Sequence, residues 1–235
     1  MRLFSSRLPA LLLLSLPSRS RALSTLLQSP AAERNKGPIL AALAEHSCFQ
    51  KGPSSPPPRV SVLEIASGAG IHCAHLASSP DLPLSLYQPS DPSPACREST
   101  DRRVLSSPSL RCPVPPSLPL STSSLPAALP EPSYDLLLAF NLAHISPWPA
   151  TLGLLSLAAR ALPPAGALVL YGPFLIAGRT APSNRGFDAS LRERDAEWGV
   201  RDLEEVEEAA GERGLVRSHL LGMPANNHLV AFQRR

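Results

Sequence analysis

Short apolar runs with the length of buried strands recur along the chain. They predict six strands, over 60–66, 84–87, 134–140, 167–171, 215–221 and 229–232. Before and between these runs, apolar residues repeat at helical spacing. This spacing predicts helices over 32–47, 152–159 and 203–213, and a further helix that begins with residues 71–77. Asp202 and Glu205 form a capping-box pattern before the last helix, and Gly214 is placed to end it. The alternation of strand and helix, closed by a final pair of strands, predicts an α/β sheet with helices on both faces.

One long stretch interrupts this pattern. Of the 44 residues from 89 to 132, 11 are Pro and 10 are Ser, and no sustained helix or strand periodicity survives in them. We expect most of this stretch to be a flexible insertion on the surface. A second, shorter Gly/Pro/Ser segment over 51–59 predicts a linker.

The charge is concentrated at the beginning of the chain. Residues 1–32 contain four Arg and seven Ser but no acid, and without them the formal net charge of +3 becomes −1, from 18 basic and 19 acidic residues. We interpret residues 1–32 as a disordered transit peptide for a mitochondrion or plastid, with processing before Ser24, and residues 33–235 as one domain. The alternatives are a secretory signal around Leu11–Leu14 and a cytoplasmic protein. The apolar run is too short for a membrane span.

Residues 64–70 (Glu-Ile-Ala-Ser-Gly-Ala-Gly) join a predicted strand to a predicted helix. Small residues there let a ligand approach the backbone, and the carboxyl end of such a strand is where α/β sheets bind ligands. The acid Glu64 suits an amine-bearing ligand better than a pyrophosphate. Asp91, 27 residues later, can accept hydrogen bonds from a ribose. A nicotinamide-dependent oxidoreductase is disfavoured, because Cys73 stands where its fingerprint needs a small residue.

Other classes of site receive little support. His72 and His75 have a spacing that can hold zinc, but further ligands are not evident, so we expect no metal. The four cysteines have no paired spacing and are expected to be free thiols. No basic stripe with interleaved aromatic residues implies nucleic acid, and a small-molecule partner is favoured. The sequence gives no oligomeric state.

The pattern acid-x-small-x-Gly-x-Gly at 64–70 resembles motif I of class I S-adenosylmethionine-dependent methyltransferases. Several blocks are similar to the methyltransferase-like 26 family, over roughly 33–50, 60–91 and 134–234. These blocks include 32–40 (AERNKGPIL), 88–91 (QPSD), 141–146 (NLAHIS), 171–174 (YGPF), 183–192, 197–202 and 223–227 (MPANN). The resemblance implies a Rossmann-like class I methyltransferase sheet, in which the Pro/Ser-rich insertion replaces or obscures the third strand. It also implies S-adenosylmethionine as the cofactor and a small polar methyl acceptor.

The resemblance also implies roles for particular residues. Those expected to hold the cofactor are Glu64, Ala66, Gly68, Gly70, Asp91, Asn141, Arg34 and Asn35. His144 and Tyr171 are candidates for catalysis, with a hydrogen-bonded structural histidine and a packed rim tyrosine as the alternatives. The candidates for a polar substrate pocket are Asn184, Asp188, Arg192, Arg201 and Asn226, which can equally order a long loop or a turn.

One departure from the family's pattern keeps a second function open. The family has a strand that ends in an aspartate where this chain has its Pro/Ser stretch, and Arg111-Cys112-Pro113-Val114 offers no such acid. In the broader fold that acid often holds the adenine amino group. The alternative to an active methyltransferase is therefore a catalytically weak or inactive binding or regulatory protein with the same fold.

Overall fold

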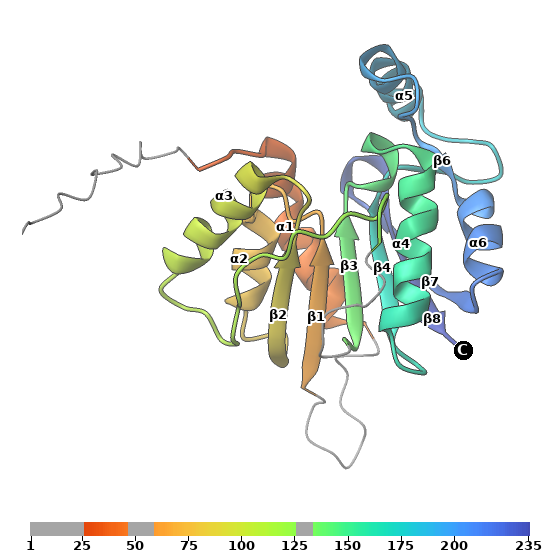
Figure 1. The fold of residues 1–235 in the computed structure, drawn as a ribbon. Helices are drawn as coiled ribbons and strands as arrows, with labels where there is room; N and C mark the ends of the chain where they lie inside the picture. Colours follow the sequence, from red (N-terminus) through yellow and green to blue (C-terminus); the bar gives the residue numbers. More distant parts are fainter. Residues whose placement is uncertain (1–25, 47–58, 126–133) are drawn as a thin grey trace, which may run out of the picture.

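A computed structural model describes residues 26–46, 59–125 and 134–235. A sheet of six strands forms its centre, and Figure 1 shows this sheet between its helices. The strands lie in the order β2-β1-β3-β4-β8-β7. The first four are parallel, β8 is antiparallel to β4, and β7 is antiparallel to β8. Their bounds are β1 Val60–Ile65, β2 Leu84–Ser90, β3 Leu136–Phe140, β4 Ala167–Gly172, β7 Leu215–Met223 and β8 Asn227–Arg234. The carboxyl ends of β1, β2 and β3 point to the same edge, the top of Figure 1.

Helices cover both faces of the sheet, as predicted (Figure 1). One apolar cluster joins the sheet to α1 (Pro30–Ala44), α2 (Ile71–Ala77) and α3 (Pro94–Leu105), for example through Ile39 and Leu76. The other joins it to α4 (Trp148–Ala161) and α6 (Leu203–Gly211), for example through Leu155 and Val206. Burial of these side chains on both faces explains why β3 and β4 are apolar at nearly every position.

Smaller elements lie beyond the carboxyl edge of the sheet. A two-stranded sheet pairs β5 (Phe174–Leu175) with β6 (Arg201–Asp202), and α5 (Pro182–Arg194) stands above it (Figure 1). Two 3-10 turns complete this edge, η2 (Ala143–Ile145) after β3 and η3 (Pro224–Asn226) between β7 and β8. These elements therefore surround the end of the sheet at which ligands bind in this architecture.

The expectation that no sustained helix or strand occurs in 89–132 is wrong for its first part, residues 89–105. Strand β2 extends to Ser90, and residues 94–105 form helix α3. The Ser93 hydroxyl accepts a hydrogen bond from the Cys96 N–H, and Pro94 occupies the first turn of the helix, where its missing N–H does no harm. Beyond Pro94 the helix contains no further proline, so the proline content of the whole stretch concealed it.

The position next to β2, where the third strand was expected, is occupied by an irregular segment. Pro113 O accepts from Tyr87 N at 3.0 Å, and Leu118 exchanges two backbone hydrogen bonds with Pro89 and Asp91, each at 3.0 Å. Ser90 and Leu118 form an isolated parallel bridge. Prolines 113, 115 and 116 have no N–H to donate, so within the described part of the chain this pairing does not become a regular strand.

Most of the predicted leader, residues 1–25, lies outside the described residues, as does the predicted linker over 51–59 except for Arg59. Helix α1 begins at Pro30, so the last three residues assigned to the leader are helical. Among the helices of the described ranges, none is long and apolar enough to cross a membrane.

Candidate functional site

The turn after β1 has the backbone conformation that its small residues permit. Ala66, Gly68 and Gly70 have positive φ angles of 57°, 57° and 76°. A Cβ built on Gly68 would meet nothing closer than Ala66 O at 3.9 Å, whereas one on Gly70 would lie 2.6 Å from Thr100 Cα. Gly70 is therefore needed because α3 packs against it, and Gly68 leaves the outer side of the turn open.

Asp91 holds this turn from the end of β2. It is 5% exposed, and its Oδ2 accepts a hydrogen bond from Gly68 N at 2.9 Å. Its Oδ1 accepts from Ser93 N at 2.8 Å. The carboxylate predicted to hold a ribose thus lies beside the turn as expected, and each oxygen already receives one backbone N–H. A carboxylate oxygen can accept a second hydrogen bond, so the ribose role stays a prediction.

Glu64, the next-to-last residue of β1, is buried below the turn. It is 1% exposed, and its Oε2 has no hydrogen-bond partner among the described residues. Burial raises its pKa to about 7; the side chains of Ser67 and Tyr87 counteract this, and the charge of Asp91 adds to it. Near neutral pH the carboxyl is therefore partly protonated.

A pocket of about 160 Å³ lies at the carboxyl edge of β1 and β3. Three segments line it: the beginning of α1, the turn with the first residues of α2, and the end of β3. The lining residues are Ser29, Ala32, Ala66, Ser67, Gly68, Ala69, Ile71, His72, Phe140, Asn141, Leu142 and Ile145. The structure thus brings three of the predicted cofactor residues together here, namely Ala66, Gly68 and Asn141. Asn141 has a positive φ of 55°, which turns the chain sharply after β3.

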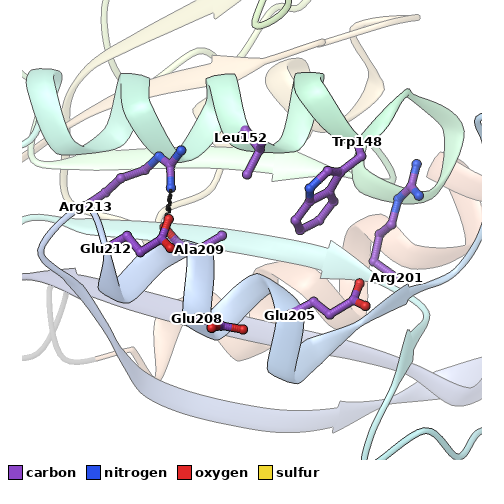
Figure 2. Close-up of a pocket in the computed structure, with 8 residues that line it drawn as sticks. All are labelled: Trp148, Leu152, Arg201, Glu205, Glu208, Ala209, Glu212 and Arg213. Carbon is purple, nitrogen blue, oxygen red and sulfur yellow. Dashed lines mark hydrogen bonds and ion pairs between the residues drawn. The ribbon is translucent and has the colours of Figure 1, made fainter.

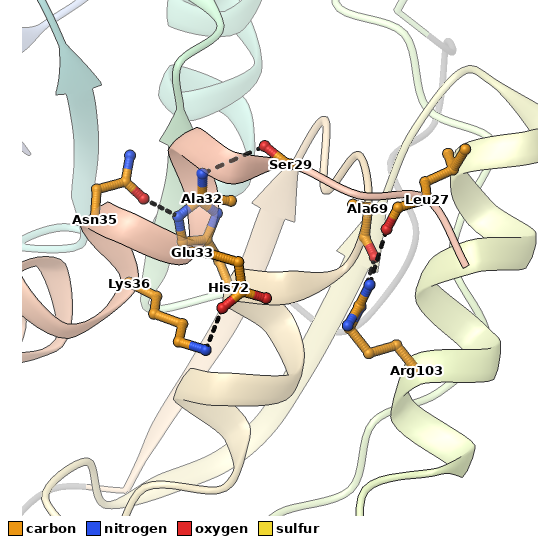
Figure 3. A network of polar contacts seen from close by, with 9 residues as sticks. All are labelled: Leu27, Ser29, Ala32, Glu33, Asn35, Lys36, Ala69, His72 and Arg103. Carbon is orange, nitrogen blue, oxygen red and sulfur yellow. Dashed lines mark hydrogen bonds and ion pairs between the residues drawn. The ribbon is translucent and has the colours of Figure 1, made fainter. Parts of the chain in front are cut away.

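Asn35 lies just behind this pocket, whereas Arg34 does not contribute to its wall. Asn35 is 9% exposed, and its Oδ1 lies 2.7 Å from His72 Nε2. Figure 3 draws this contact as a dashed line between α1 and α2. Burial lowers the pKa of His72 to about 4, so its ring is neutral at pH 7. Arg34 is exposed on α1 and is not among the residues that line the pocket.

Tyr171, at the end of β4, is 3% exposed. Burial raises its pKa, and hydrogen bonds with the side chains of Asn35 and Asn227 partly offset this. The hydroxyl is therefore held between α1 and the start of β8. Because Asn35 also bonds His72, Tyr171 is connected to the wall of the pocket without lining it.

His144, the other candidate for catalysis, is buried and lies outside the lining of the pocket. It is 5% exposed, its ring packs edge-on against Phe187 at 5.6 Å between centroids, and it does not line the pocket beside Asn141. Burial, followed by the charge of Arg201, lowers its pKa to about 4. These contacts fit the structural alternative for His144.

Three of the predicted substrate residues instead order the loop after α5. Asp188 accepts from Val200 N at 2.7 Å through Oδ1 and from Arg192 Nε at 2.9 Å through Oδ2. Arg201 donates to the backbone oxygens of Ala143, Ser146 and Glu197 at 3.0, 2.6 and 2.7 Å. Since these side chains are committed to local contacts, the geometry favours the loop-ordering alternative for them.

Asn184 and Asn226 connect α5 to the turn between β7 and β8. Asn184 Nδ2 donates to Asn226 O at 2.9 Å, and Asn226 Nδ2 donates to Ser183 Oγ at 3.0 Å. Asn226 also lines a second pocket, of about 420 Å³, at the same edge of the molecule. Its lining residues are Phe174, Ile176, Arg179, Thr180, Ala181, Gly222, Met223, Asn226, Asn227 and His228.

Sequence reasoning missed Arg179, the cation of this second pocket. It follows a tight turn at Ala177 and Gly178, both with positive φ, in which Ile176 and Arg179 exchange backbone hydrogen bonds at 2.8 and 3.0 Å. Glu204 Oε1 anchors the turn by accepting from Ala177 N. In the sequence, Gly178 indicates a turn at this point. A single glycine does not indicate that the next residue, Arg179, lines a pocket.

A third hollow, of about 520 Å³, lies between α4 and α6 (Figure 2). Glu205 and Glu208 line it from α6 and Glu212 from the residue that follows this helix, with Trp148 and Leu152 on α4. It lies on the outer surface of the helices, away from the turn after β1. Within the described ranges, no group of three or more potential metal ligands occurs.

The strand order, the crossover helices and the ligand edge define a Rossmann-like class I methyltransferase fold, and solved structures share it. One is an O-methyltransferase family protein from Burkholderia thailandensis, with a TM-score of 0.65 and 16% identity over 86% of this chain and 56% of that one. Another is human N-acetylserotonin methyltransferase in complex with SAM, with a TM-score of 0.63 and 12% identity over 85% and 51% of the two chains. The chain thus spans about half the length of these two proteins.

A relative of more similar length is the magnesium protoporphyrin IX methyltransferase from Synechocystis PCC 6803, solved with bound SAH. Its TM-score is 0.60, and the match has 14% identity over 86% of this chain and 83% of that one. At the level of sequence families, residues 27–234 match the family described as a protein of unknown function, DUF938. The chain belongs to this family.

Proposed function

We propose that this protein is an S-adenosylmethionine-dependent methyltransferase that transfers a methyl group in line to a small polar acceptor. The observation that carries the proposal is the open turn at Ala66–Gly70, held by Asp91 and facing Asn141 across a pocket. The solved relatives support it, since one is described with SAM and another with SAH.

The chemistry of the residues fits such a cofactor. The unpartnered Oε2 of Glu64 is a buried acceptor beneath the turn, and a cationic amino group reached directly or through water would satisfy it. Gly68 leaves room for close approach, and Asp91 retains lone pairs for a ribose. We assign to the cofactor Glu64, Ala66, Gly68, Gly70, Asp91 and Asn141, with Asn35 supporting the wall through His72.

When bound, S-adenosylmethionine supplies a methyl group that its positive sulfur has already activated. The chain's task is then to align the acceptor with that group and to keep water out. Neither buried histidine near the site is poised to exchange a proton at neutral pH, because His72 and His144 both have pKa values lowered to about 4. We therefore expect an acceptor that reacts without a histidine base, and Tyr171 to position groups rather than to ionise.

We place the acceptor near the second pocket. Asn227 lines it and is hydrogen-bonded to Tyr171, which Asn35 links to the cofactor pocket. Arg179, Asn226 and His228 give it a polar wall, while Phe174 and Met223 give it apolar surface. This mixture suits a small polar molecule better than a nucleic acid.

The alternative is a protein of this fold that binds the cofactor weakly or does not turn over. It is favoured by the segment beside β2, which ends without an acid of its own. Ser117 there donates twice to Asp101 Oδ1 of α3, from N at 2.8 Å and from Oγ at 2.6 Å. Under this alternative, adenine is recognised without the usual carboxylate, and affinity is correspondingly lower.

The test is a calorimetric titration of the purified full chain with S-adenosylhomocysteine, followed by a methyl-transfer screen of small polar acceptors. Asp91→Ala should weaken binding by at least tenfold, because it removes the carboxylate that fixes Gly68 N. Asp81→Ala, an exposed aspartate before β2, is the matched control. Equal affinities for the parent and Asp91→Ala would contradict the site.

Two finer assignments follow from the sequence. We infer that the chain lies close to the methyltransferase-like 26 family, on blocks such as 171–174 and 223–227. We also infer that residues 1–32 direct the protein to a mitochondrion or plastid. Fusion of residues 1–32 to a fluorescent protein tests the second inference, with a variant in which Arg2, Arg7, Arg19 and Arg21 are replaced by Gln as the control. Diffuse fluorescence from both fusions would contradict it.

A further inference from the structure

The chain reaches α1 along the wall of the cofactor pocket. Residues 26–29 precede the helix, and the Ser29 hydroxyl caps it by accepting a hydrogen bond from Ala32 N at 3.3 Å. Ser29 and Ala32 both line the pocket of about 160 Å³. This short segment, which we term the strap, is therefore part of the ligand site although it lies outside the sheet and its helices.

Two side chains of α3 hold the strap and the turn together, as Figure 3 shows for Arg103. Leu27 N donates to Ser99 Oγ at 3.0 Å, and Leu27 O accepts from Arg103 Nη2 at 2.9 Å. The same two side chains also bond Ala69 O of the turn, from Ser99 Oγ at 3.2 Å and from Arg103 Nε at 2.9 Å. One residue of the strap and one carbonyl of the turn are thus joined by residues one helical turn apart.

The arginine is the more specific of the two attachments. A guanidinium is a planar fork that can donate to two carbonyls at once, and hydrogen bonds from a charged donor are stronger than those between neutral groups. Arg103 uses this fork across the gap between Ala69 and Leu27. A lysine at this position would offer its donors from a single nitrogen, without the separated, planar nitrogens of the fork.

The size of the pocket shows why this attachment matters. Pockets that hold a cofactor or drug-sized ligand measure about 300–1,000 Å³, and this one measures about 160 Å³. Movement of one wall would enlarge the pocket for a ligand of that size. The turn and the end of β3 are anchored in the sheet, whereas the strap is held through side-chain hydrogen bonds and Leu27 is 39% exposed.

We propose that residues 26–29 form a movable strap over the cofactor pocket and that Arg103 is the positioning residue that fastens it. The proposal rests on the proposed cofactor site and adds the device that admits and retains the ligand. Closure depends on the hydrogen bond from Arg103 to Leu27 O. The second hydrogen bond of Arg103, to Ala69 O, holds the closed strap beside the turn.

The experiment measures S-adenosylhomocysteine dissociation from immobilised full-length chain by surface plasmon resonance. Arg103→Ala should raise the dissociation rate about tenfold, and Arg103→Lys should recover only part of the loss. Arg102→Ala, which removes the same charge one residue earlier on α3, should leave the rate unchanged. In the absence of ligand, hydrogen exchange at the Leu27 amide should be slow in the parent and fast in Arg103→Ala.

A second substitution tests whether Arg103 acts through the strap. Leu27→Pro removes the N–H that donates a hydrogen bond to Ser99 Oγ. The double variant Leu27→Pro/Arg103→Ala should then differ from Leu27→Pro by less than twofold in dissociation rate. If Arg103→Ala has the same effect in both backgrounds, it acts on the turn or the ligand and the proposal is wrong. If the parent binds no S-adenosylhomocysteine, the proposed function fails, whereas the strap itself is refuted by an unprotected Leu27 amide in the parent.

Discussion

Replacing Glu64 by glutamine should stabilise the protein above neutral pH and leave it nearly unchanged in acid. The side chain is 1% exposed, and burial raises its pKa from an ordinary 4.5 to about 7. The folded protein therefore retains a proton that the unfolded chain releases between these two pH values. Stability from this group is fully present below about pH 4.5 and is lost as the pH rises through about 7.

The size of the effect follows from that change in pKa. One pKa unit is worth about 1.4 kcal/mol, so the carboxylate costs about 3 kcal/mol of unfolding free energy at pH 8. Glu64→Gln is close in shape and has no charge. Its free energy of unfolding should therefore exceed that of the parent by about 3 kcal/mol at pH 8, but by only about 1 kcal/mol at pH 5.

Urea unfolding followed by circular dichroism at both pH values measures this difference. Glu193→Gln, which removes an exposed acid from α5, is the control and should leave the difference between pH 5 and pH 8 as it is in the parent. If Glu64→Gln and the parent differ by the same amount at pH 5 and pH 8, then Glu64 is not a buried acid with a raised pKa. The account of its place beneath the turn would then be wrong.

Two further substitutions test the packing around the site. Gly70→Ala should cost about 2–4 kcal/mol of unfolding free energy, because its Cβ would lie 2.6 Å from Thr100 Cα at a φ of 76°. Gly68→Ala, which has open space at a φ of 57°, should cost about 1 kcal/mol. Equal losses for the two variants would contradict the close contact between Gly70 and α3. Arg201→Ala should cost about 2–4 kcal/mol through three lost hydrogen bonds to backbone oxygens, against less than about 1 kcal/mol for Arg192→Ala in its exposed ion pair. Thermal unfolding compares each pair, and a smaller loss for Arg201→Ala than for Arg192→Ala would refute its role in ordering the loop.

The sheet and the turn after β1 could be predicted because their signals are local. Strands such as β1, β3 and β4 have the apolar runs of buried strands, and the turn carries its small residues in one block of seven. The carboxyl ends of parallel strands meet at one edge of a sheet. The positions of Asp91 and Asn141 at the ends of two such strands therefore predict that both lie near Gly68, as they do.

Helix α3 is not predicted, because the high proline and serine content of residues 89–132 as a whole conceals the helical segment within it. Eleven prolines in 44 residues suggested irregular structure, although the local signal of Ser93 followed by Pro94 is that of a helix start. Without α3 the positions of Ser99, Thr100 and Arg103 against the turn could not be foreseen.

The remaining site contacts join residues far apart in the sequence. Asn35 and His72 are 37 residues apart, and Leu27 and Arg103 are 76 apart. Periodicity and motif spacing carry no information on such pairs. The same limit explains why the sequence leaves Arg201 open between a substrate pocket and an ordered loop. The three backbone oxygens that receive its hydrogen bonds are brought together only when η2 and the loop after α5 are folded.

The most direct test of the central claim is a calorimetric titration of the full chain with S-adenosylmethionine, with NAD as the comparison ligand. The turn, Asp91 and the pocket beside Asn141 predict saturable binding of S-adenosylmethionine at one site per chain and no binding of NAD. A folded protein that binds neither compound, or that binds NAD alone, would contradict the account.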